Sequence, residues 1–213
     1  HEIAFMRELG VTKVQIGAQS FNERILEENH RGHTVNETLT AIALLRAAGF
    51  KIVMHWMPNL LGATPSSDKK DFMHMWEDGF CPDEIKIYPT QLVKEAPLYK
   101  IWLEGGFTPY STDQLIDLIA SLKPSIPEYC RVNRIVRDIP SDYIVAGSQR
   151  SSLRQDIQQE LARRGQRCRC IRCREIRGKP VNLSSLRFSD LIYYPKDSEE
   201  HFFNFSTSDD RLA

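Results

Sequence analysis

Short runs of β-branched residues alternate along the chain with longer segments whose apolar residues recur at helical spacing. The short runs predict strands at 11–16, 51–57, 84–88 and 131–137. The longer segments predict helices at 1–10, 22–29, 34–49, 68–76 and 111–122. Thr34 and Glu37 have the spacing of a capping box, and Gly49 is a typical helix stop. Alternation at this spacing predicts an α/β fold with parallel strands and right-handed crossovers.

Each predicted strand ends in polar or glycine-containing residues, at 17–20, 55, 88–90 and 137–138. In parallel α/β folds the carboxyl ends of the strands carry the chemistry. We therefore expect a barrel or half-barrel with a functional site at this rim. A simpler interpretation stays open for Gln19 and His55 taken singly, since each could be a hydrogen-bonded cap at a strand end.

The charges are unevenly distributed, although the chain has no net charge. Residues 150–179 hold ten Lys or Arg against three acids, so this basic segment carries +7 and the rest of the chain −7. Leu153, Ile157 and Leu161 have helical spacing and should pack on the body, leaving the neighbouring arginines free. Clustered arginines favour a nucleic-acid partner, because guanidinium pairs with phosphate oxygens. The alternative is a solvated helix face.

Three of the five cysteines, Cys168, Cys170 and Cys173, lie within six residues of the basic segment. This spacing allows one backbone turn to direct three thiolates at one metal ion, and zinc is the metal we expect. Cys130 or a histidine would supply a fourth ligand. An iron–sulfur cluster and three reduced cysteines in an exposed loop are the alternatives. An odd cysteine count argues against a disulfide framework, and no apolar run is long enough to span a membrane, so we expect a cytoplasmic protein.

Six motifs occur in an order that resembles the Elongator protein 3 family. They are Gln15–Ser20, Arg31–Thr34, His55–Pro58, Lys86–Pro89, Arg134–Pro140 and Arg169–Glu175. The family joins a radical S-adenosylmethionine (SAM) domain to a GNAT-type acetyltransferase domain. The resemblance implies an enzyme that uses acetyl-CoA and radical chemistry to form a carboxymethyl group at C5 of the wobble uridine, U34, in the anticodon stem-loop of tRNA.

The resemblance also implies roles for individual residues. Gln15, Gln19, His55 and Lys86 would face the SAM pocket, although Gln15 stands where the family commonly has a glutamate. The basic residues expected to contact RNA are Arg31, His33, Arg134, Arg137, Arg150, Arg154, Arg163, Arg164 and Arg167. The cysteines of the family's [4Fe–4S] cluster would lie upstream of His1, because the three present here follow the last predicted strand.

Three segments are expected from these patterns. Residues 1–145 would form the C-terminal part of a radical SAM (β/α) partial barrel, 146–180 a basic, cysteine-rich zinc linker, and 181–213 the first strands of the acetyltransferase domain. Such a central fragment would be inactive alone, with most of the acetyl-CoA site outside it. Other Elongator subunits or self-association are further expected partners. The alternatives are a non-catalytic, zinc-pinned tRNA-binding module and a histone-type lysine acetyltransferase.

Overall fold

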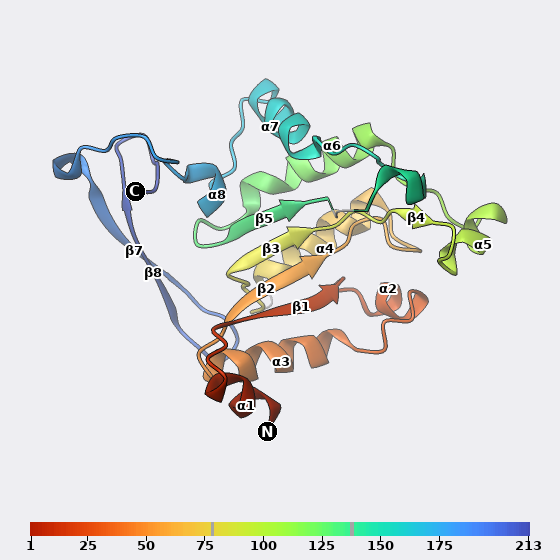
Figure 1. The fold of residues 1–213 in the computed structure, drawn as a ribbon, viewed down its shortest axis with the longest axis horizontal. Coiled ribbons are helices and arrows are strands. Elements are labelled where there is room, and N and C mark those ends of the chain that lie inside the picture. The colour runs from red at the N-terminus through yellow and green to blue at the C-terminus, as the bar shows by residue number, and fades with distance from the viewer. Residues whose placement is uncertain (78, 137–138) are drawn as a thin grey trace.

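A four-stranded parallel sheet forms the centre of the computed structural model, which describes residues 1–77, 79–136 and 139–213. Its strands are β1 (Lys13–Gln19), β2 (Lys51–Trp56), β3 (Glu84–Ile87) and β5 (Arg131–Ile135). They lie side by side in the order β1-β2-β3-β5, and every neighbouring pair is parallel (Figure 1). The α/β fold with a parallel sheet is therefore confirmed.

Helices along one face of the sheet bury the apolar core (Figure 1). Ile52, Met54 and Trp56 on β2 are fully buried in this core, as are Ile85 and Ile87 on β3. The α-helices of this part of the chain are α1 (Glu2–Glu8), α2 (Glu23–Glu28), α3 (Val35–Ala47), α4 (Pro65–Glu77), α5 (Leu98–Leu103), α6 (Thr112–Leu122) and α7 (Leu153–Arg163).

Local sequence signals account for several helix ends. Thr34 and Glu37 form the predicted capping box at the start of α3, and Ser111 and Gln114 form a second one at α6. Each box satisfies backbone N–H groups that have no partner within the helix. Gly49 follows α3 with φ +77°, a conformation in which a side chain is disfavoured.

Other elements differ from the sequence prediction. Helix α4 begins at Pro65, three residues before the predicted start, and β1 extends past Ile16 to Gln19 through an irregularity in its pairing with β2. The short strands β4 (Leu92–Val93) and β6 (Ile144–Ala146) pair antiparallel, and together with α5 they were not predicted. They are too short for a periodic pattern to identify them.

The basic segment forms the predicted helix, α7, with Leu153, Ile157 and Leu161 buried against the body. Helix α7 packs on α6, and the short helix α8 (Ile171–Arg174) follows (Figure 1). The 3₁₀ turns are η1 (Lys123–Ser125), η2 (Ser141–Tyr143) and η3 (Leu183–Ser185).

The chain ends in an antiparallel hairpin of β7 (Arg187–Tyr193) and β8 (Glu200–Ser206), beyond the amino ends of the parallel strands (Figure 1). Tyr193 Oη donates to Asp83 at 3.2 Å, and Lys51 pairs with Glu200 at 3.0 Å, so polar contacts attach the hairpin to the core. The division into three segments and the identity of this hairpin as the start of an acetyltransferase domain stay predictions. Among the described helices, none has the length and apolar character required to cross a membrane.

Candidate functional site at the carboxyl rim of the sheet

The sheet face opposite the helices carries polar side chains that meet across three strands. His55 Nε2 on β2 lies 3.0 Å from Gln15 Oε1 on β1, and Lys86 Nζ on β3 donates to the same oxygen at 2.6 Å. Side chains alternate between the two faces of a strand, so the apolar neighbours of these residues point into the core. Gln15, His55 and Lys86, which we call the polar triad, thus occupy one face, on which Gln15 is exposed and the other two are half-buried.

Gln19, which was expected to meet His55 and Lys86, instead lies over Gly17. A Cβ atom added to Gly17 would stand 2.8 Å from Gln19 Nε2 and 3.8 Å from an Arg31 nitrogen. A glycine at this position leaves room for the amide. His33 contacts the carbonyl oxygens of Arg31 at 3.1 Å and of Ala18 at 3.4 Å. Gln19, Arg31 and His33 therefore gather at the carboxyl end of β1.

A continuous row of hydrogen-bonding groups crosses the rim. The strand register places His55 beside Lys86, and Lys86 beside Arg134 on β5. The His55 ring also packs edge-on against Tyr88, with centroids 5.3 Å apart. Arg137, a predicted RNA contact, lies outside the described residues. The row offers an amide oxygen, an imidazole and cationic donors, and these groups suit a ligand with a carboxylate, an amino group and hydroxyls, as SAM has.

Two buried aspartates on α4 support the loops that carry this rim, and sequence reasoning missed both. Asp71 accepts from Ser20 Oγ at 2.9 Å, from the Phe21 amide at 2.6 Å and from Trp56 Nε1 at 2.7 Å. Burial raises the pKa of its carboxyl, and these donors oppose the shift. Helical spacing of i and i+3 between Asp68 and Asp71 was the available signal.

Asp68 holds the second loop of the rim. Its carboxylate accepts from the Asn59 amide at 2.8 Å and from the Tyr110 hydroxyl at 2.9 Å. Burial is the main cause that raises the pKa of Asp68 to about 6, against an ordinary value of 3.8. The same burial, together with the nearby Asp68 charge, raises the pKa of Tyr110, so the phenol stays protonated and donates. Asp68 thereby connects the loop after β2 to the approach to α6.

Cys168, Cys170 and Cys173 come together around α8, where their sulfur atoms lie within 4.8 Å of one another. The cluster is not in an exposed loop, because Cys168 and Cys170 are buried. A hydrogen bond from the Cys168 thiol lowers the pKa of Cys170. The buried Lys123 also places Nζ 3.8 Å from Cys173 Sγ. Three convergent sulfurs and a nearby cation suit a metal bound as thiolates.

The fourth metal ligand considered from sequence is not part of this cluster. Cys130 lies outside the group of three, among the residues that the structure describes. Burial raises the pKa of its thiol well above the ordinary value, and the nearby Cys170 charge raises it further. Its carbonyl instead accepts from the Ile171 amide at 3.0 Å, which positions α8 against the end of β5.

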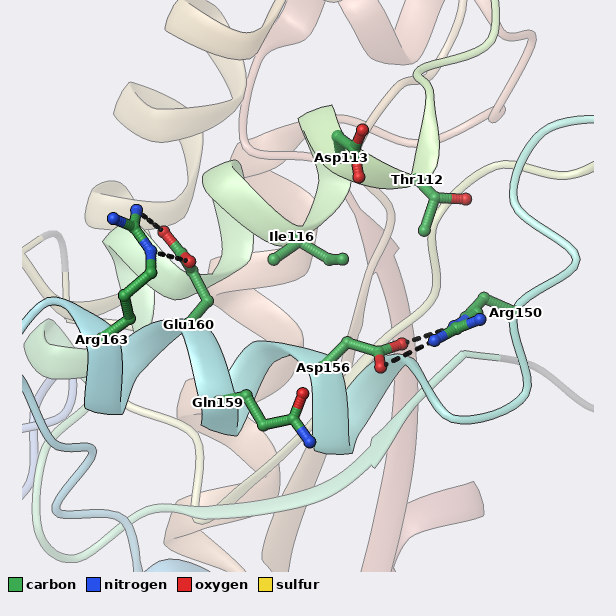
Figure 2. Close-up of a pocket in the computed structure, with 8 residues that line it drawn as sticks. All are labelled: Thr112, Asp113, Ile116, Arg150, Asp156, Gln159, Glu160 and Arg163. Carbon is green, nitrogen blue, oxygen red and sulfur yellow. Dashed lines mark hydrogen bonds and ion pairs between the residues drawn. The ribbon is translucent and has the colours of Figure 1, made fainter.

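The expectation that the arginines around α7 are free is wrong. A groove of about 650 Å³ lies between α6 and α7. Figure 2 shows an ion pair at each end of it. Arg150 pairs with Asp156 at 2.8 Å, and Arg163 pairs with Glu160 at 2.7 Å. Asp113 adds a further acid to the lining, so this groove does not present a net positive charge to phosphate.

Three further arginines of the basic segment also have partners. Arg164 pairs with Asp117 at 2.7 Å, and Arg167 lies 3.6 Å from Asp210. Arg154 points inward and donates to the carbonyl oxygens of β5. Asp117 and Asp210 lie more than forty positions from the arginines that they pair with. Composition alone could therefore not reveal these two ion pairs.

Comparison with known proteins places this geometry in a family. Residues 1–71 match the model of the radical SAM superfamily, and residues 82–163 match that of the Radical_SAM C-terminal domain. The chain is 39% identical over 217 residues to a tRNA uridine(34) acetyltransferase of Dehalococcoides mccartyi, covering 99% of the chain and 47% of the relative. It is 38% identical to Elongator complex protein 3 of Dictyostelium discoideum, covering 78% of the chain and 30% of the relative.

A solved structure agrees with these matches. The archaeal Methanocaldococcus infernus Elp3 with an N-terminal deletion superposes with a TM-score of 0.94 at 35% identity, covering 99% of this chain and 51% of that one. The chain thus spans about half of that structure and less than half of the two relatives. The matched models, these relatives and the motifs gathered at the rim agree, and the chain belongs to the Elongator protein 3 family of radical SAM proteins.

Proposed function

We propose that this chain is part of an enzyme that modifies the wobble uridine of tRNA, building a carboxymethyl group at C5 from acetyl-CoA. The polar triad at the carboxyl rim of the parallel sheet carries this proposal, because it is a preformed polar site in a chain of this family. Relatives named tRNA uridine(34) acetyltransferase indicate the substrate. The protein would work in the cytoplasm, alone or with other Elongator subunits.

The polar triad is suited to hold SAM. The Lys86 ammonium would pair with the carboxylate of the cofactor, and the Gln15 amide oxygen would accept from its amino group. His55 and Gln19 would contact the ribose or the base, with Gly17 leaving the space that Gln19 needs. Bound next to a [4Fe–4S] cluster, SAM supplies the radical chemistry of the superfamily.

The cysteine cluster would hold a zinc ion with a structural role. Three thiolates from one short segment, with Lys123 reducing the net negative charge, suit a closed site between the parallel sheet and the hairpin. Such a site would fix α8 against the end of β5. The tRNA would approach the rim, where Arg31 and His33 follow β1 and Arg134 follows Lys86 in the strand register.

Nucleoside analysis of tRNA treated with the complete enzyme, SAM, reductant and acetyl-CoA tests the proposal. We expect 5-carboxymethyluridine at position 34 with the unaltered enzyme, and a loss of at least about tenfold in the Lys86→Ala enzyme, because a charge-assisted contact is removed. Lys13→Ala is the matched control: Lys13 lies on β1 near the amino ends of the strands and forms a surface ion pair with Glu84. Absence of the modified nucleoside with the unaltered enzyme would overturn the proposal.

A further inference from the structure

Two arginines of the basic segment differ from the rest in having no carboxylate partner. Among the described residues, Arg154 and Arg172 form no ion pair. The other seven arginines between 150 and 177 each lie within 4 Å of an acid, namely Arg150, Arg163, Arg164, Arg167, Arg169, Arg174 and Arg177. Among the described arginines of this segment, these two alone lack an ion pair, and both border the same pocket.

That pocket has a volume of about 490 Å³ and opens where β5 ends. Arg134, Arg154 and Arg172 line it together with amide side chains such as Asn133 and Gln149. No aspartate or glutamate belongs to its lining in the part of the chain that the structure describes. In contrast to the groove between α6 and α7, the described lining of this pocket holds arginines and no acid.

The Arg154 guanidinium is held by the backbone of β5, and both guanidinium groups are incompletely satisfied. Arg154 Nη2 donates to the carbonyl oxygens of Val132 at 3.1 Å and of Asn133 at 3.2 Å, which anchors one edge of its guanidinium to β5. Its Nη1 and the Arg172 Nε are buried and have no hydrogen-bond partner. Both side chains line the same pocket, so the two guanidinium groups face one cavity. Burying unpaired like charges is costly unless an anion joins them.

We propose that Arg154 and Arg172 form a binding pocket for a phosphodiester group of the RNA substrate. Guanidinium is suited to this ligand because its planar N–H groups pair with two phosphate oxygens at once. Ile135, Ile139 and Ile144 on the pocket wall suit the ribose or base attached to that phosphate. This inference rests on the proposed function, and it moves the RNA contact from the exposed face of α7 into a pocket.

The position of the pocket connects it to the polar triad. Lys86 on β3 is paired in register with Arg134 on β5, and Arg134 also lines the pocket. RNA backbone held by Arg154 and Arg172 would therefore run along the rim where SAM is proposed to bind. A phosphate fixed there would position a nucleotide at the reacting site without reading its base, because phosphate contacts carry little sequence information.

Filter binding of an anticodon stem-loop RNA to the complete enzyme at several salt concentrations tests the pocket. For Arg154→Gln/Arg172→Gln we expect affinity to fall about tenfold to a hundredfold. The slope of log affinity against log salt should decrease by about 0.7 to 0.9, one phosphate's worth. Arg163→Gln is the matched control on the same helix: Glu160 already compensates its charge, so its affinity should change less than about twofold.

The outcomes separate this inference from the proposed function. If the unaltered enzyme does not bind the stem-loop, the proposed function fails. If it binds but the double variant keeps both affinity and slope, only the pocket inference fails. Arg154 lies within electrostatic reach of the three cysteines, so zinc content and thermal unfolding are measured for each variant. Lost RNA affinity with retained metal and stability supports the pocket. The pocket inference is overturned if RNA affinity is lost only in variants that also lose zinc. It is also overturned if the double variant loses coenzyme A binding while RNA binding stays intact.

Discussion

At the scale of single residues, the rim depends on carboxylates that burial disfavours. Asp68 and Asp71 are 4% and 6% exposed, yet each accepts hydrogen bonds that fix a loop of the rim. Such groups stabilise one conformation of the loops, because a displaced loop would leave a buried acceptor unpaired. Their ionisation should therefore appear in the stability of the whole chain.

Asp68→Asn should change how stability depends on pH. Unfolded chains lose the Asp68 proton near pH 4, whereas the folded chain keeps it to about pH 6, so the folded state binds more protons between these values. The free energy of unfolding of the unaltered chain should thus fall, relative to that of the variant, by up to about 3 kcal/mol from pH 4 to pH 6. Urea unfolding at several pH values measures the difference. A difference that stays constant or increases with pH would contradict the assignment.

Single residues also show where sequence reasoning reached its limit. Strand-end motifs predicted that Gln15, His55 and Lys86 face one site, but Gln19, also expected there, lies over Gly17. The sequence did not predict the ion pairs of the arginines. The Arg164–Asp117 and Arg167–Asp210 pairs join residues more than forty positions apart. Asp68 and Asp71 escaped notice because acids on a helix are ordinarily exposed.

At the scale of elements, the most regular patterns were the most predictable. The four parallel strands follow from runs of buried β-branched residues, and α3 and α6 follow from their capping boxes and apolar faces. Strands β4 and β6 hold two and three residues, too few for periodicity, and only their mutual pairing defines them. Spacing predicted the cysteine cluster correctly, but its burial depends on the packing of α8.

A zinc ion in this cluster should be measurable as a stabilising ligand. We expect about one zinc per chain by metal analysis, and its loss in Cys170→Ser, because Cys170 is one of the three convergent sulfurs. Removal by a chelator should lower the free energy of unfolding by about 3 kcal/mol or more, as for a ligand present at a hundredfold excess over its Kd. Cys81 is a buried cysteine outside the cluster, so the Cys81→Ala variant should keep the zinc ion of the cluster. Purified chain without zinc, or unaffected by the chelator, would contradict this expectation.

At the scale of the whole molecule, the four-stranded parallel sheet and the β7–β8 hairpin have different roles. The helix-covered face of the parallel sheet supplies the core, and its opposite face carries the polar triad, so one four-stranded unit provides both stability and a site. The hairpin is attached beyond the amino ends of the strands, away from the rim (Figure 1). Exposed Phe188, Phe203 and Phe205 on the hairpin contrast with the closed packing of the sheet.

The proposed function depends most on SAM binding at the polar triad. Equilibrium dialysis of labelled SAM against the complete enzyme, its Lys86→Ala variant and the Lys13→Ala control measures this directly. Loss of the Lys86 ammonium should raise the Kd about tenfold to a hundredfold, because a charge-assisted hydrogen bond is removed, while thermal unfolding stays unchanged since the side chain is only half-buried. Lys13→Ala should bind as the unaltered enzyme does. Equal Kd values for the enzyme and Lys86→Ala would contradict the assignment of this rim as the cofactor site.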